Sequence, residues 1–125
     1  MARKKSPTLT DAELRLMTIL WERGPSTVGV VVETLPEDVP LAYSTVLTTL
    51  RILEQKGYLR HEKQGRAYVY HPVVDRRAAR RNALRYVMNR FFNNSPELLV
   101  LGVLENEDMD LADLERLKNI LEERD

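Results

Sequence analysis

The fold is decided by one stretch, residues 42–71, with the sequence AYSTVLTTLRILEQKGYLRHEKQGRAYVYH. Its first part carries apolar residues at helical spacing and stops at Lys56-Gly57, where glycine can take the left-handed conformation that ends a helix. Two short alternating runs follow, 58–63 and 66–71, joined by a polar turn at Gln64-Gly65. The pattern predicts a helix followed by a β-hairpin.

Two further helices are expected before this stretch. The segment Thr10-Asp11-Ala12-Glu13 fits a capping box, and apolar residues then recur at helical spacing until Gly24-Pro25. A second helix would be capped by Ser26 or Thr27, although its run of β-branched residues makes a strand the competing interpretation. Three helices and a hairpin that ends near Val74 are the order of a winged helix-turn-helix domain, so the predicted fold class is mainly α.

Residues 75–125 are expected to be helical and to carry a dimerisation surface. The segment 98–104 is apolar on nearly all sides, and a short helix of this kind must be covered. Three helices of about 50 residues form a poor core alone, so a second copy of the chain is expected to cover them in a two-fold dimer. The alternative is that they fold back on their own winged helix. The residues assigned to the dimerisation surface are Leu84, Met88, Phe91, Leu98, Leu101, Leu104, Leu114, Leu117 and Leu121.

Composition narrows the class of protein. The chain has 125 residues, 43% of them hydrophobic, without an apolar run long enough to cross a membrane and without a secretory leader at its start. It has no cysteine, which excludes disulfides and cysteine-based metal sites and suits a reducing cytoplasm.

The formal net charge is zero, but the charges are unevenly distributed. Residues 76–92 hold six arginines and no acid, whereas residues 93–125 hold ten acidic and three basic side chains. A neutral total therefore hides a basic body and an acidic tail, and a polyanion responds to the local field. The arginines could flank DNA or pair with the acidic tail of a partner chain.

One face of the helix predicted over residues 43–56 is suited to lying in a DNA groove. Val46, Leu50 and Leu53 fall together on the core side, and the opposite side carries hydroxyls, an amide and a guanidinium. The alternatives are an ordinary solvated helix face and a solubilising hairpin turn. Arg3, Lys4 and Lys5 form an arm that could also reach DNA. The candidate DNA contacts are Tyr43, Ser44, Thr45, Thr48, Arg51 and Gln55 on the helix, with Lys63 and Arg66 at the hairpin tip.

The sequence offers no catalytic site, cofactor site or metal site. His61-Glu62 begins like a zinc protease helix motif, but Gly65 stands where the motif needs its second histidine and the segment reads as a strand. No nucleophile has a plausible base beside it, and no glycine-rich phosphate loop is present. We therefore expect a protein that is not an enzyme and uses no cofactor.

Seven short motifs occur in order along the chain: LTDAE at 9–13, ILW at 19–21, YSTV at 43–46, EQKGYL at 54–59, GRAYVY at 65–70, NRFF at 89–92 and LEN at 104–106. Together they resemble the penicillinase repressor family, the BlaI/MecI-type regulators. The resemblance implies a cytoplasmic homodimeric repressor that binds a palindromic operator in double-stranded DNA. Residues 1–74 would be its DNA-binding domain and residues 75–125 its dimerisation region.

In this family, a membrane sensor-protease system that senses β-lactam leads to cleavage of the repressor in its dimerising tail. The matching stretch here is 100–105, with Gly102-Val103 where typical staphylococcal members have Asn-Phe. Ile52 stands where an arginine is common in the recognition helix. A copper-responsive branch carries a cysteine-rich tail motif, which this chain lacks. The resemblance thus implies release by cleavage near Gly102 and Val103, and no membrane insertion of the repressor itself.

Two other functions compete with this one. A winged helix can serve as a protein-interaction module, with the wing and third helix meeting a protein. Alternatively, the chain could be a ligand-sensing repressor of the multiple-antibiotic-resistance type, with an effector pocket between its domains. The tail is short for such a pocket, and the sequence shows no convergent set of polar residues.

Overall fold

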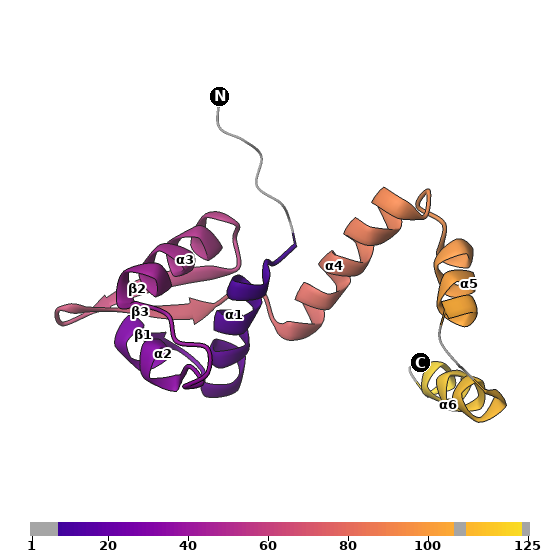
Figure 1. The fold of residues 1–125 in the computed structure, drawn as a ribbon, viewed down its shortest axis with the longest axis horizontal. Coiled ribbons are helices and arrows are strands. Elements are labelled where there is room, and N and C mark those ends of the chain that lie inside the picture. The colour runs from indigo at the N-terminus through magenta and orange to yellow at the C-terminus, as the bar shows by residue number, and fades with distance from the viewer. Residues whose placement is uncertain (1–7, 107–109, 124–125) are drawn as a thin grey trace. The chain divides into compact units, whose positions relative to one another are not determined.

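The computed structural model describes residues 8–106 and 110–123, except for the side chain of Leu121 (Figure 1). The chain forms two compact units, Met1–Tyr86 and Val87–Asp125, which meet within one long helix. The predicted division at residues 74 and 75 separates DNA binding from dimerisation, and it stays a prediction. The elements in chain order are α1 (Asp11–Arg23), β1 (Ser26–Thr27), α2 (Val28–Thr34), α3 (Tyr43–Gln55), β2 (Leu59–Gln64), β3 (Ala67–Pro72), α4 (Arg76–Phe91), α5 (Pro96–Asn106) and α6 (Leu111–Glu122).

The first unit is the predicted winged helix-turn-helix, with α1, α2 and α3 packed beside a small antiparallel sheet (Figure 1). The capping box of α1 is present, since the Thr10 hydroxyl accepts from the Glu13 N–H at 3.2 Å and the Thr10 N–H donates to the Glu13 carboxylate at 3.0 Å. Gly24 ends this helix at a positive φ of 88°. The fully buried residues of the core are Leu16, Met17, Leu20, Val31, Val46, Leu50 and Leu53.

The sheet has a third strand that the sequence pattern did not predict. Ser26 and Thr27 form β1, which pairs antiparallel with β3, so the strand order is β1-β3-β2. Thr27 also caps α2 by accepting from the Val30 N–H at 3.2 Å, while the Ser26 hydroxyl donates to the Gly24 carbonyl at 2.9 Å. The β-branched run itself, Val28–Thr34, is helical, so the helix interpretation is confirmed and the competing strand interpretation of that run is wrong.

The hairpin lies one residue later than the two predicted runs. Gly65 and Arg66 form a two-residue turn in which Gly65 has a positive φ of 63°, so Gln64 pairs with Ala67. Glycine at the first turn position suits the tight hairpin turns that match strand twist. Tyr58, predicted to begin the hairpin, precedes it and is buried, because Gly57 at φ 87° turns the chain from α3 into the core.

A buried ion pair between Lys56 and Glu13 connects the end of α3 to the start of α1. The Lys56 ammonium donates to the Glu13 carboxylate at 2.7 Å and to the Thr8 carbonyl at 3.1 Å. Both charged side chains are at most 7% exposed. The same carboxylate completes the cap of α1, so the end of α3 is held to the start of α1.

The second unit contains the end of α4 together with α5 and α6. The predicted break at Asn93-Asn94-Ser95-Pro96 is confirmed: both asparagines have positive φ, and the Ser95 hydroxyl accepts from the Leu98 N–H at 3.2 Å. Asp110 caps α6, as predicted, by accepting from the Asp113 N–H at 2.9 Å. No residue of α5 is buried in the single chain. None of the described helices is long and apolar enough to cross a bilayer.

Candidate nucleic-acid interface

The outer face of α3 is exposed and polar along its length. Val46, Leu50 and Leu53 are fully buried, which confirms the predicted core side of the helix. The Thr49 hydroxyl donates to the Thr45 carbonyl at 2.8 Å, so it is already used within the helix. The exposed residues of this face are Tyr43, Ser44, Thr45, Thr48, Arg51 and Gln55, all of them predicted candidates.

The register of the hairpin sorts the side chains of the wing onto two faces. His61 lies opposite Tyr70 and Lys63 lies opposite Tyr68, so these four share one face. Arg60 lies on the other face, where its guanidinium contacts the Glu62 carboxylate at 2.6 Å. The hydrogen bond from Arg60 is the main reason that the pKa of Glu62 lies below its usual value.

The wing tip carries two unpaired positive charges. Lys63 and Arg66 are exposed, and neither forms an ion pair with any residue that the structure describes. The other basic residues of the hairpin, Arg60, His61 and His71, all contact carboxylates. Lys63 and Arg66, the predicted contacts at the tip, are thus the basic residues of the wing that have no carboxylate partner among the described residues. The arm at Arg3, Lys4 and Lys5 lies outside the described residues.

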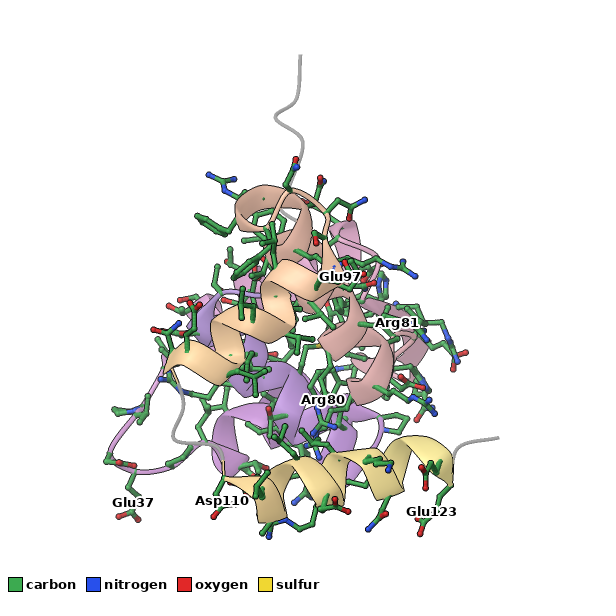
Figure 2. The ribbon with its side chains drawn as sticks, turned by 90° about the vertical axis from the view of Figure 1, so that its right-hand side faces the viewer. Glu37, Arg80, Arg81, Glu97, Asp110 and Glu123 are labelled. Carbon is green, nitrogen blue, oxygen red and sulfur yellow. The ribbon has the colours of Figure 1, made fainter. Side chains whose placement is uncertain are left out.

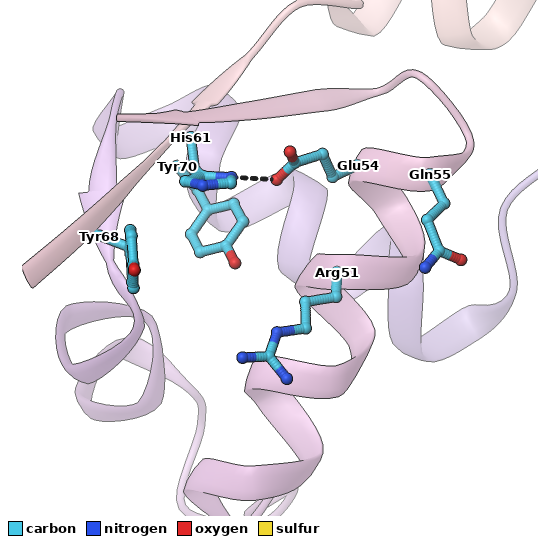
Figure 3. Close-up of a pocket in the computed structure, with 6 residues that line it drawn as sticks. All are labelled: Arg51, Glu54, Gln55, His61, Tyr68 and Tyr70. Carbon is cyan, nitrogen blue, oxygen red and sulfur yellow. Dashed lines mark hydrogen bonds and ion pairs between the residues drawn. The ribbon is translucent and has the colours of Figure 1, made fainter. Parts of the chain in front are cut away.

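A cleft of about 470 Å³ separates α3 from the wing (Figure 3). The Glu54 carboxylate on α3 lies 2.6 Å from the His61 Nδ1 on β2 and so bridges the two elements. The Tyr68 ring meets the His61 ring edge-on, with centroids 5.1 Å apart. The contact between Glu54 and His61 therefore holds the wing against the helix, while the ring contact joins the two strands of the wing. The residues lining the cleft are Arg51, Glu54, Gln55, His61, Tyr68 and Tyr70.

Tyr70 lines this cleft and is buried. Burial is the main cause that raises the pKa of its hydroxyl, and the Glu54 carboxylate adds to the effect. The Arg51 guanidinium opposes the rise because it interacts favourably with the ionised form. Arg51 therefore interacts with the Tyr70 hydroxyl inside the cleft and still remains exposed (Figure 3).

Sequence reasoning located part of this cleft and missed the rest. Arg51 and Gln55 were predicted, whereas Glu54, Tyr68 and Tyr70 were not. His61 was considered with Glu62, as the start of a rejected zinc protease motif. The alternation of the hairpin runs could have placed His61 and Tyr68 on one face. The packing of this face against α3 depends on the tertiary structure, which the alternation of side chains does not determine.

The predicted dimerisation residues are largely exposed in the single chain. Phe91 is 70% exposed, and the predicted leucines of α5 and α6 that the structure describes are 40–49% exposed. Met88 is partly buried. The side chain of Leu121 lies outside the described part. The predicted residues that are exposed are Leu84, Phe91, Leu98, Leu101, Leu104, Leu114 and Leu117.

The described residues contain no cluster of histidine, cysteine, aspartate or glutamate that could hold a metal ion. His61-Glu62 lies on strand β2, as expected, and each of the two side chains faces a different side of the sheet.

The three-helix core, the wing and the exposed polar face of α3 are those of a winged-helix transcription regulator. The model of the penicillinase repressor family matches residues 9–123, nearly the whole chain. The chain therefore belongs to the penicillinase repressor family, whose members are DNA-binding repressors rather than enzymes.

Several relatives are similar over almost their full length. The penicillinase repressor of Bacillus licheniformis is 33% identical over 120 residues, which cover 96% of this chain and 94% of the relative. The methicillin resistance regulatory protein MecI of Staphylococcus aureus (strain N315) is 22% identical over 96% of this chain and 98% of its own length.

Two solved structures are each similar to about three fifths of the chain. The DNA-binding domain of the repressor BlaI in solution is 35% identical with a TM-score of 0.51, over 59% of this chain and 90% of that one. The monomeric form of Bacillus licheniformis BlaI in complex with the blaP half-operator is 34% identical with a TM-score of 0.50, over 61% of this chain and 93% of that one.

Proposed function

We propose that the chain is a cytoplasmic homodimeric repressor that binds a palindromic operator in double-stranded DNA. The observation that carries this proposal is the exposed polar face of α3 beside a wing with free positive charge, in a chain of this family. The relative solved with a half-operator supports one winged helix to each half-site. Binding would block a promoter.

In this proposal α3 enters the major groove. The hydroxyls of Ser44, Thr45 and Thr48 contact phosphates or base edges, and threonine methyls contact thymine methyls. Arg51 donates to a guanine or a phosphate. Lys63 and Arg66 contact the backbone next to the groove and supply affinity without sequence preference. Tyr43 and Gln55 lie at the two ends of the helix and limit the contacted site.

The helices after the winged helix supply the dimer contact in this proposal. Residues 1–74 bind DNA and residues 75–125 pair with a second chain. The exposed leucines of α5 and α6 support the pairing, because apolar surface of this extent is unfavourable in water. A dimer contacts two half-sites at once, which raises affinity for a full operator far above that of one winged helix.

Release would follow cleavage near Gly102 and Val103, driven by a membrane sensor-protease system that responds to an antibiotic or a cell-wall signal. Both residues lie within helix α5. A protease binds its substrate in an extended conformation, so α5 must unwind locally before the cut. A cut there would divide the dimerisation helices and leave the reading face of α3 intact.

A selection experiment tests DNA binding. Genomic fragments retained by the full chain define an operator, and gel shifts with base-substituted operators then measure sequence preference. Replacing Arg51 by alanine should change the preference at one position, while Arg23→Ala, an exposed arginine at the end of α1, should behave like the parent. Retention of no specific fragment would refute the proposed function and favour the protein-interaction module. Equal binding of every operator variant by the parent and Arg51→Ala would refute base reading by Arg51.

Truncation after Asn94 tests the release mechanism. The shortened chain keeps the winged helix and lacks α5 and α6, so it should be monomeric and bind the full operator weakly. A truncated chain that stays dimeric and holds the operator as tightly as the full chain would rule out release by cleavage near Gly102.

A further inference from the structure

A second hollow lies on the first unit, between α1 and the first two turns of α4. Its volume is about 350 Å³, within the range of small-molecule sites. It is formed by other residues than the cleft between α3 and the wing. The residues lining it are Thr8, Leu9, Leu14, Thr18, Trp21, Arg76, Ala79, Arg80 and Ala83.

The walls of this hollow are held in place by hydrogen bonds and packing. The Trp21 indole N–H donates to the Val74 carbonyl at 2.9 Å, which fixes the ring plane. The Asp75 carboxylate accepts from the Ala78 N–H at 2.7 Å and caps the start of α4. Ala79 is only 8% exposed because it packs on the core. The hollow is therefore formed before any ligand arrives.

The lining combines an apolar floor with positive charge and no acidic residue. Arg76 and Arg80 lie one turn apart on α4, beside the side chains of Leu9, Leu14 and Trp21. The Arg76 guanidinium lies 5.4 Å from the centre of the Trp21 ring and 3.6 Å from the Glu22 carboxylate. That ion pair is exposed and weak.

Arg80 has no partner in the described part of the chain, whether by ion pair or hydrogen bond. The residues before Thr8 carry three basic and no acidic side chains, so they offer no counter-charge. Two guanidinium groups beside an apolar floor are matched by a ligand with an anionic end and an apolar body.

We propose that this hollow binds a small organic carboxylate with an apolar chain or ring. The carboxylate accepts hydrogen bonds from Arg80 and Arg76, and the apolar part lies against Leu9, Leu14 and Trp21. Such a ligand would touch both α1 and the start of α4, the helix that continues into the second unit. The site does not depend on DNA binding. It is a pocket that the sequence pattern did not predict.

The single tryptophan of the chain lines the hollow and reports its occupancy. Octanoate is a suitable probe because it has a carboxylate and an apolar chain and does not absorb where tryptophan emits. Titration of the full chain with octanoate should give a saturable change in Trp21 fluorescence. Octan-1-ol, which lacks the charge, should bind about tenfold or more weakly.

Variants of neighbouring residues locate the site. Arg80→Gln should weaken octanoate binding about tenfold, and Ala83→Phe, a substitution at an exposed position, should fill the hollow and abolish binding. Arg81→Gln is the matched control, because Arg81 projects from α4 in another direction and does not line the hollow (Figure 2). The absence of a saturable signal would overturn the proposal. So would equal affinity for octan-1-ol, or equal loss in Arg80→Gln and Arg81→Gln.

Because fluorescence is measured without DNA, this result is independent of operator binding. A chain that binds octanoate but selects no operator would refute the proposed function and leave the site standing. A chain that selects an operator but shows no saturable octanoate signal would do the reverse.

Discussion

Replacing Lys56 by methionine should strongly destabilise the winged helix. The substitution removes the ammonium that contacts the Glu13 carboxylate at 2.7 Å and the Thr8 carbonyl at 3.1 Å. The carboxylate then stays buried, and it still accepts a hydrogen bond from the Thr10 N–H at 3.0 Å. Removing one partner of a buried ion pair costs about 3–5 kcal/mol. Because the Thr10 contact compensates part of the loss, we expect a cost of about 3 kcal/mol.

Urea unfolding followed by Trp21 fluorescence measures this cost in the first unit, at a fixed protein concentration because association also stabilises the fold. With a denaturant slope of about 1–3 kcal/mol/M, the midpoint should fall by about 1–3 M. Arg60→Met is the matched control, since its ion pair with Glu62 has a similar distance of 2.6 Å but side chains about half exposed. It should cost less than about 1 kcal/mol.

A double variant separates the uncompensated charge from the lost packing. Glu13→Gln combined with Lys56→Met keeps an oxygen that accepts from the Thr10 N–H but removes the buried charge. It should regain about half of the stability lost in Lys56→Met. The reasoning fails if Lys56→Met is no more harmful than Arg60→Met, or if the double variant is no more stable than Lys56→Met.

Three further predictions concern the wing, the cleft and the end of α3. Alanine at both Lys63 and Arg66 should weaken binding to all sequences evenly and lower the salt slope of log K by about 2 per chain; Arg60→Ala should not, and an unchanged slope in the double variant would exclude phosphate contacts at the tip. The pKa of the Tyr70 hydroxyl is raised above its usual 10.0. The protonated hydroxyl therefore stabilises the folded state fully below the unfolded-state pKa, and this stabilisation is lost as the pH rises through the folded-state pKa. The urea midpoint of Tyr70→Phe should therefore fall less steeply above pH 10 than that of the parent, and parallel curves would contradict this. Gly57→Ala should cost about 1 kcal/mol because only the positive φ of 87° opposes it, with no atom within 4 Å of the added carbon; Gly57→Asn should cost less in the same unfolding assay, and an equal cost would point to another cause.

Local chemistry made most of the elements predictable. A helix cap needs only residues three apart, so Thr10 with Glu13 and Asp110 with Asp113 mark helix starts in the sequence alone. The same holds for the left-handed glycine that follows α3. The polar face of α3 was also predictable, because a helical period and a buried stripe determine which residues point outward.

Features that depend on distant residues were not predictable in the same way. Strand β1 consists of two residues and forms because it pairs with β3, so it is too short to be predicted from an alternating pattern of side chains. The exact position of the hairpin turn was also open, because the sequence did not determine that Gly65, with its positive φ, would be the first of the two turn residues. The Glu54–His61 bridge needs the packing of the wing on α3, and the Arg80 hollow needs the packing of α4 on α1.

Whether two chains act together on DNA is tested most directly by sedimentation of the full chain with its selected operator. We predict two chains on one duplex with both half-sites intact, and much weaker binding when one half-site is replaced by unrelated sequence. A single chain bound tightly and selectively to the full operator, with no loss when one half-site is replaced, would contradict the account.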